Sequence, residues 1–304
     1  SAIQYLAEDP VEYVGSWSSG GSLNTARGEN FGNGVGTQTA AAVAGGATVP
    51  GNVAVHEQYD GTSWTETTDI NTAREGTWAD GTQPAFWVAG GGYTTNTETW
   101  NGSAWTEVNN LNTGRSYGGG TCGRSSTAGL VVAGYTGTAN SNAVESWDGT
   151  NWTEIAEVNS ARRKASGFGT STAAFAIGAS PSPGNPGLTD TVESWNGSSW
   201  TETTEINSGR GASSGAGTTT DGLIAGSEQS PTNALTENWN GTTWTEVADL
   251  GTARGNFAGS GGTGSVAWAA GGTPGSGYVT NTEEWNFPPS TSTILQEGQL
   301  WFNY

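Results

Sequence analysis

A repeated pair of residues constrains the fold of this chain more than any other feature: a tryptophan is followed ten residues later by an arginine, six times. The pairs are Trp17 and Arg27, Trp64 and Arg74, Trp105 and Arg115, Trp152 and Arg162, Trp200 and Arg210, and Trp244 and Arg254. Successive arginines lie 41 to 48 residues apart, so whole units repeat while one segment inside them varies in length. A period of this size is typical of repeat architectures in which similar units pack side by side.

Each unit is predicted to form four strands, because it shows no helical periodicity. A run of small residues such as "GNFAGSGGTG" follows the arginine, and an apolar segment ending in glycine, such as "AFWVAGGG", comes next. After a loop of changing length come a segment such as "VESWDG" and a closing segment such as "SWTETTDINTAR". Four strands in roughly 45 residues is the pattern of a β-propeller blade. We therefore predict an all-β, six-bladed propeller of four-stranded blades.

The predicted propeller occupies residues 1–286, with blades starting near residues 27, 74, 115, 162, 210 and 254 and a C-terminal tail at 287–304. The last unit lacks its outer strand, because Ser290 stands where the next tryptophan is expected and follows Pro288 and Pro289. We predict that an N-terminal strand, residues 11–17 ("VEYVGSW"), completes the sixth blade and closes the ring. The alternative is that "ILQEGQLWFN" in the tail fills the same place.

The Asn-Gly and Asp-Gly pairs between the third and fourth strands suit a tight type I′ hairpin, which needs a positive φ at both central residues. The four Asn-X-Ser/Thr sequences, at Asn101, Asn151, Asn196 and Asn240, lie in or beside these turns. Turn chemistry explains them without glycosylation.

Two resemblances to known proteins add to the prediction of a propeller. The segment "VVAGY…VESWDGTNWTEIAEVNSAR" resembles the kelch repeat, and the likeness covers about residues 11–286. It implies a propeller but no particular function, because kelch propellers do many things. Arrays such as "WNGSSWTE" and the tail element "EGQLWFN" are similar to segments of tail-fibre and other virion proteins of marine bacteriophages. This second resemblance implies a virion location, with other virion proteins or a host-surface glycan as partners.

Composition excludes several classes of function. Nine Lys and Arg against 28 Asp and Glu give a formal net charge of −19, which disfavours nucleic acid and an anionic membrane surface as partners. Cys122 is the single cysteine, so neither an intrachain disulfide nor a zinc site of several thiolates is possible. His56 is the single histidine, no Ser-His-Asp pattern or phosphate-binding glycine loop is marked out, and no stretch of 18 apolar residues occurs. We expect no catalysis, no cofactor, no metal and no membrane insertion.

Two sets of repeated residues are candidates for structural or functional roles. Six of the basic residues are the repeated arginines, and six glutamates recur two positions before the aromatic residue of the third strand: Glu57, Glu98, Glu145, Glu193, Glu237 and Glu283. A sialidase-like carboxylate clamp is one interpretation of the arginines. Six equivalent copies favour structural ion pairs, because catalytic groups do not recur in this way.

A ladder of aromatic residues also recurs in the third strands: Tyr59, Trp100, Trp147, Trp195, Trp239 and Trp285. Stacking on sugar rings would make the protein a lectin, but a regular position in a strand favours packing between blades. Trp87 and Trp268 fall in the apolar glycine-ended strands and are predicted to lie in the core.

Loop lengths suggest where a binding surface would lie. Turns between the first and second strands are uniform ("GTQTA", "GTSTA"), whereas loops between the second and third strands vary widely ("YTTN", "YTGTANSN", "ASPSPGNPGLTD"). Varied loops on a rigid scaffold are typical of binding surfaces. We predict Tyr93, Tyr135, Asn185 and Tyr278 as exposed contacts there; neutral insertions are the alternative. The function expected is a non-enzymatic viral structural or attachment module; a secreted or cell-surface lectin, or an enzyme without a recognisable motif, are the alternatives.

Overall fold

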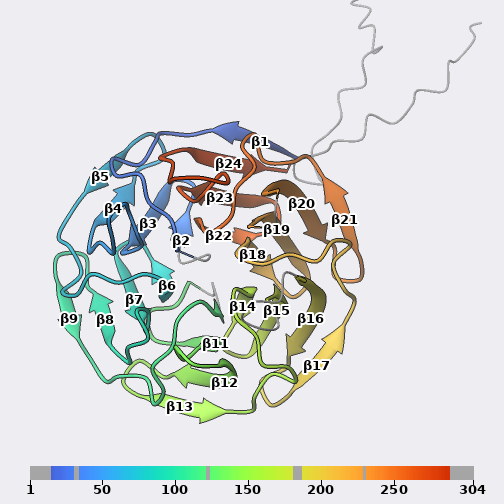
Figure 1. The fold of residues 1–304 in the computed structure, drawn as a ribbon, viewed down its shortest axis with the longest axis horizontal. Helices are drawn as coiled ribbons and strands as arrows, with labels where there is room; N and C mark the ends of the chain where they lie inside the picture. The colour runs from blue at the N-terminus through green and yellow to red at the C-terminus, as the bar shows by residue number, and fades with distance from the viewer. Residues whose placement is uncertain (1–14, 31–33, 121–123, 181–186, 229–230, 288–304) are drawn as a thin grey trace, which may run out of the picture.

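The computed structural model describes residues 15–30, 34–120, 124–180, 187–228 and 231–287. In these residues the chain forms strands and no helix, arranged as six four-stranded antiparallel sheets around one axis (Figure 1). The predicted all-β, six-bladed propeller is confirmed.

The strands of the first five blades run outward from the axis in chain order, and those of the sixth blade are β22, β23, β24 and β1. The first three blades are β2 (Gly34–Thr37), β3 (Ala40–Ala44), β4 (His56–Tyr59), β5 (Trp64–Glu66); β6 (Trp78–Thr82), β7 (Ala85–Ala89), β8 (Thr97–Trp100), β9 (Trp105–Glu107); and β10 (Gly119–Gly120), β11 (Gly129–Tyr135), β12 (Asn140–Trp147), β13 (Trp152–Ile155). The other three are β14 (Ser166–Thr170), β15 (Ala173–Ala179), β16 (Thr189–Trp195), β17 (Trp200–Thr203); β18 (Ser214–Thr218), β19 (Asp221–Ser227), β20 (Asn233–Trp239), β21 (Trp244–Val247); and β22 (Ala258–Thr263), β23 (Val266–Ala270), β24 (Thr282–Asn286), β1 (Ser16–Ser19).

The innermost strands consist mainly of small residues because neighbouring blades meet closely around the axis. A Cβ built on Gly215 of β18 would lie 2.8 Å from the Phe168 ring and 3.1 Å from the Gly167 carbonyl oxygen, both in the preceding blade. Such contacts leave no space for a larger side chain at this position. The runs of small residues in the sequence therefore identify the strands that form the inner wall of the ring.

The N-terminal strand closes the ring, as predicted. Strand β1 pairs antiparallel with β24 and supplies the outer strand of the sixth blade, with Trp17 opposite Trp285. The strand spans Ser16–Ser19 rather than the predicted 11–17, and residues 11–14 lie outside the described residues, as does the alternative segment in the tail.

The predicted type I′ hairpins are wrong. The third and fourth strands are joined by four residues, of which only the glycine has a positive φ, for example Gly149 at 91°. The preceding Asp148 carboxylate accepts hydrogen bonds from the backbone N–H groups of Thr150 (2.8 Å) and Asn151 (2.7 Å). Because the side-chain oxygen satisfies two turn donors, a single left-handed residue suffices. Asn or Asp plays this part in the other hairpins of the first five blades.

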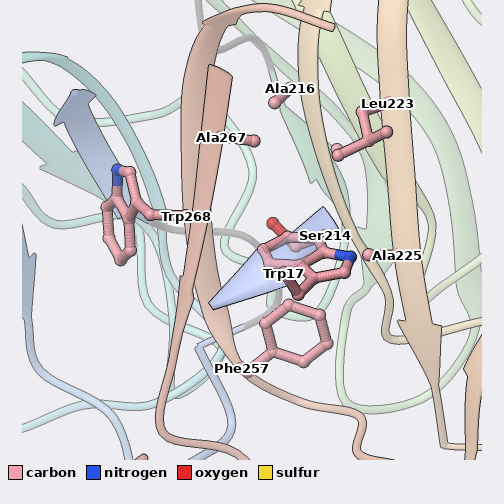
Figure 2. Close-up of a pocket in the computed structure, with 9 residues that line it drawn as sticks. Trp17, Ser214, Ala216, Leu223, Ala225, Phe257, Ala267 and Trp268 are labelled. Atoms are coloured by element: carbon pink, nitrogen blue, oxygen red, sulfur yellow. The ribbon is translucent and has the colours of Figure 1, made fainter. Parts of the chain in front are cut away.

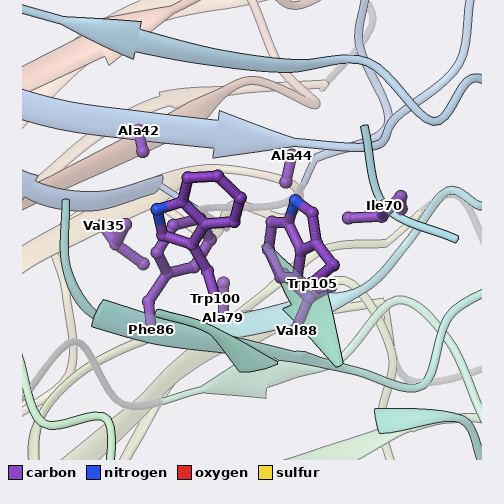
Figure 3. Close-up of a cluster of buried hydrophobic side chains, with 9 residues drawn as sticks. All are labelled: Val35, Ala42, Ala44, Ile70, Ala79, Phe86, Val88, Trp100 and Trp105. Atoms are coloured by element: carbon purple, nitrogen blue, oxygen red, sulfur yellow. The ribbon is translucent and has the colours of Figure 1, made fainter. Parts of the chain in front are cut away.

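Aromatic residues fill the space between blades. Figure 3 shows one such cluster, in which Phe86, Trp100 and Trp105 of the second blade face small and branched side chains of the first, such as Val35 and Ala42. All six residues of the third-strand ladder are buried, as are Trp87 and Trp268, so these aromatics are core. Burying each large ring contributes on the order of 3 kcal/mol.

Each outer-strand tryptophan also donates its indole N–H to the preceding blade. The acceptor depends on the residue that stands immediately before the repeated glutamate in the third strand of that preceding blade. Where that position is threonine, its hydroxyl accepts: Trp17 to Thr236, Trp64 to Thr282 and Trp152 to Thr97, at 2.9 to 3.1 Å. Where it is Val144, Val192 or His56, a backbone carbonyl accepts: Trp200 to Ala156, Trp244 to Thr204 and Trp105 to Thr68, also at 2.9 to 3.1 Å. At every junction between blades the indole donor of the outer-strand tryptophan is thus satisfied.

A small internal cavity marks the junction of the fifth and sixth blades. Trp17 lies over it, and Leu223, Phe257 and Trp268 are among its lining residues (Figure 2). The lining is apolar apart from Ser214 and the backbone. Ligand sites need several convergent polar groups, so this cavity is a packing gap beside the closing strand.

Candidate functional site

The repeated arginines and glutamates form six buried ion pairs, one in each blade. The pairs are Arg27–Glu57, Arg74–Glu98, Arg115–Glu145, Arg162–Glu193, Arg210–Glu237 and Arg254–Glu283. All twelve side chains are at most 8% exposed. Burial lowers the pKa of each arginine, and nearby carboxylates oppose this effect. The buried guanidinium groups are not available to a ligand at the surface.

Each glutamate also holds the turn that enters its blade. The Glu145 carboxylate accepts hydrogen bonds from the backbone N–H (2.7 Å) and the side-chain amide (2.8 Å) of Asn112. The same pair of bonds recurs at Asn24, Asn71, Asn159 and Asn207, and Gly251 supplies the backbone bond alone in the sixth blade. This contact explains the "NTAR" motif, because asparagine provides two donors to one carboxylate oxygen.

The arginine backbone links neighbouring blades. In all six blades the arginine carbonyl accepts a hydrogen bond of 2.8 to 3.1 Å from a backbone N–H near the end of the second strand of the preceding blade. Gly46 donates to Arg74 and Gly272 to Arg27, for example. These bonds connect neighbouring blades, and the ion pairs act within each blade, beneath the variable loops.

The variable loops and the "NTAR" turns lie at one end of the axis, which we call the variable-loop face. Of the three predicted contacts there that the structure describes, only Tyr93 is exposed, at 45%. The prediction of exposure is wrong for Tyr135 and Tyr278, which are half-buried. The Arg163 guanidinium covers the Tyr135 ring at 5.0 Å, and the Tyr278 ring packs over the backbone of Gly28. Asn185 lies outside the described residues.

Tyr93 belongs to a tyrosine cluster with Tyr117 and Tyr135. Its ring centroid lies 6.0 Å from that of Tyr117 and 5.9 Å from that of Tyr135, and both contacts are edge-to-face. Tyr93 has a φ of 62°, and its backbone N–H donates to the Ser116 hydroxyl at 2.8 Å. A bulky residue in this conformation costs of order 1 kcal/mol or more, and such residues concentrate at functional sites. Sequence reasoning missed Tyr117, which carries no repeat signature.

A second feature that the sequence did not indicate is a ring of six residues with positive φ around the axis, the axial ring. Its members stand two positions after each arginine and have φ between 55° and 64°: Glu29, Gly76, Tyr117, Lys164, Ala212 and Asn256. Backbone hydrogen bonds of 2.5 to 3.0 Å run from each member to the one before it, and Asn30 closes the circle by donating to the Asn256 carbonyl at 3.2 Å. The ring therefore places the side chains of different blades together at the variable-loop face.

Three carboxylates and one ammonium group meet at the axial ring: Glu29 and Lys164 belong to the ring, and Glu75 and Glu228 contact its members. Lys164 forms an ion pair with Glu228 at 2.5 Å, and the Tyr117 hydroxyl donates to Glu75 at 2.5 Å. Burial, opposed by the Lys164 ammonium and reinforced by the Glu75 and Glu228 carboxylates, raises the pKa of Glu29 to about 7. Burial and the Glu75 carboxylate also raise the pKa of Tyr117.

The opposite end of the axis is chemically different. Arg124, from the third blade, lies against Gly262 of the sixth blade, where its guanidinium occupies the space of a missing Cβ. Its backbone N–H donates to the Asp80 carboxylate at 2.7 Å. At this end of the axis, a guanidinium therefore reaches from one blade to the blade facing it, beside the Asp80 carboxylate.

Within the described ranges, no three or more histidine, cysteine, aspartate or glutamate side chains are grouped so that they could hold a metal ion. The same residues include no helix long and apolar enough to cross a membrane.

Comparison with known proteins supports the fold. The chain matches no known protein-family model, and no curated protein matches it in sequence. Among solved structures it is similar to YjhT, with a TM-score of 0.70 and 13% sequence identity over 86% of this chain and 96% of the YjhT chain. At this identity the likeness shows a shared six-bladed propeller and nothing about activity.

Proposed function

We propose that this propeller is a non-catalytic binding module whose variable-loop face recognises a glycan. The observation that carries the proposal is the tyrosine cluster, with Tyr93 exposed between two other tyrosine rings. Tyrosine rings offer an apolar face for stacking on a sugar ring and a hydroxyl for hydrogen bonding, at a low cost in side-chain entropy. The surrounding backbone holds these rings in place before a ligand arrives, which reduces the ordering cost of binding.

The repeat resemblance extends this proposal to a biological setting. In that setting the chain is a kelch-like propeller on a phage virion or tail, where it binds a host-surface glycan or another virion protein. A secreted or cell-surface lectin would use the same tyrosine cluster. The absence of catalysis is part of the proposal: His56, the single histidine, is fully buried between the first and second blades and does not reach the variable-loop face.

Binding to a glycan array tests the proposal with two variants. Tyr93→Ala removes the exposed ring of the cluster, and Val49→Ala removes another exposed side chain, 82% accessible, from a variable loop of the first blade. We expect Tyr93→Ala to weaken binding about tenfold or more, the effect of losing an aromatic anchor, and Val49→Ala to leave it unchanged. Equal binding by Tyr93→Ala and the unsubstituted protein, or no binding to any glycan by the latter, would contradict the proposal.

A further inference from the structure

Beside the tyrosine cluster, the axial ring holds a carboxylate whose hydrogen-bonding capacity is unused. Glu75 accepts from Tyr117, and Glu228 is paired with Lys164. Glu29 is half-buried, and among the described residues its carboxylate makes no hydrogen bond and no ion pair; the Lys164 ammonium, which is paired with Glu228, acts on it only at longer range. A partly desolvated carboxylate without a donor is unfavourable, so the site suits a group that brings donors or positive charge.

A second group at the axial ring is also an acceptor without a hydrogen-bond donor. Asn256 is 7% exposed, and its side-chain Oδ1 is buried without a hydrogen-bond partner in the part of the chain that the structure describes. Asn256 is the neighbour of Glu29 in the axial ring, because the backbone N–H of Asn30 donates to the Asn256 carbonyl at 3.2 Å. Native proteins rarely leave such an acceptor unsatisfied.

These acceptors adjoin the proposed glycan surface through Tyr117. Gly76 donates to the Glu29 carbonyl at 2.8 Å, and Tyr117 donates to the Gly76 carbonyl at 3.0 Å, so two backbone bonds separate Glu29 from a member of the tyrosine cluster. Tyr278, which packs on Gly28 next to Glu29, adds an aromatic ring on the other side. A sugar that lies on the tyrosines can therefore extend a substituent toward Glu29 and Asn256.

We propose that the recognised glycan carries a free, protonated amino group, which binds to the Glu29 carboxylate and the Asn256 side-chain oxygen. An ammonium group supplies three donors and a positive charge, which matches two unfilled acceptors in an acidic surround. A divalent metal fits less well, because no group of three acidic or histidine side chains converges in the described residues. This inference rests on the proposed glycan-binding function and specifies its ligand.

The preference can be measured by calorimetry at pH 7 with a glucosamine hexasaccharide and its fully N-acetylated counterpart. We expect the free amine to bind about tenfold tighter. Glu29→Gln should abolish this difference, because it removes the charge but keeps the size of the side chain. Glu66→Gln makes the same change in net charge on the exposed outer strand β5 and should preserve the difference.

The outcomes separate this inference from the proposed function. Equal affinity for the two hexasaccharides, or a preference that survives Glu29→Gln, overturns the amino-group assignment while glycan binding stands. No binding of either hexasaccharide, when the same protein binds neutral glycans on the array in a Tyr93-dependent manner, also overturns it. A failure to bind any glycan refutes the proposed function itself.

Discussion

Acidification should destabilise the junction between the first two blades through His56. The imidazole is fully buried, with its ring centroid 4.8 Å from Trp100, 5.3 Å from Trp105 and 5.4 Å from Phe86. Its Nδ1 lies within hydrogen-bonding distance of Thr67 and Thr68, and its Nε2 is buried without a partner among the described residues. Protonation would place a charge and an unsatisfied N–H among aromatic rings, so burial lowers the pKa of His56 to about 4.

The sign and size of the effect follow from this pKa. In the unfolded chain the histidine has its ordinary pKa of about 6.5, so between pH 6.5 and 4 the unfolded state binds the proton that the folded state rejects. The stability from the neutral imidazole is present above pH 6.5 and is lost as the pH falls toward 4. At 1.36 kcal/mol per pKa unit, the loss amounts to about 2 kcal/mol at pH 4.5 and about 3 kcal/mol below pH 4.

His56→Val isolates this contribution, because the third and fourth blades carry Val144 and Val192 at the same position. In those blades the neighbouring tryptophan donates to a carbonyl, as Trp105 already does beside His56. Urea unfolding followed by tryptophan fluorescence at pH 7 and pH 4.5 gives the free energy of unfolding for both proteins. We expect the unsubstituted protein to lose about 2 kcal/mol more than His56→Val. Equal losses would refute the reasoning, since titrating carboxylates are common to both.

Two further predictions concern the scaffold. Arg115→Met should lower the free energy of unfolding, measured by urea denaturation, by about 3 to 5 kcal/mol, because it leaves Glu145 buried without its cation. The control Glu154→Gln, on the exposed outer strand, should change the free energy of unfolding by less than about 0.5 kcal/mol. Similar effects of the two substitutions would contradict a structural role for the Arg115–Glu145 pair. Deletion of residues 1–19 removes β1 and its contacts with β24, and should lower the melting temperature by about 10 °C or more in a calorimetric scan; an unchanged transition would mean that the ring does not depend on this strand.

Repeat spacing was sufficient to predict the blades because side chains carry the information at those positions. Small residues mark the inner strands, and the arginine, glutamate and asparagine of each unit occupy one recurring network. The missing Trp at Ser290 indicated that a strand from elsewhere in the chain closes the ring, and the N-terminal strand was predicted in preference to the tail. The hairpins were mispredicted because the sequence "DGTN" does not reveal that the Asp148 side chain replaces a second left-handed residue.

The axial ring had no sequence signal. Its six positions hold Glu, Gly, Tyr, Lys, Ala and Asn, since the bonds that define it are made by the backbone. Tyr117 and Glu29 were missed for this reason. Tyr135 and Tyr278 were mistaken for exposed residues because the groups that pack on their rings are brought there only by the fold. These groups are the Arg163 guanidinium on Tyr135 and the backbone of Gly28 on Tyr278.

In the sixth blade, the third and fourth strands, β24 and β1, come from distant parts of the chain, whereas in every other blade a hairpin joins these two strands. Trp285 and Trp17 face each other across β24 and β1 as Trp195 and Trp200 do across β16 and β17. Joining Asn286 to Ser16 through Gly-Ser would recreate "WNGSSW", the sequence that already connects β16 to β17. The propeller is therefore suited to circular permutation, and its ends can be moved to another hairpin on the face opposite the variable loops without breaking a blade.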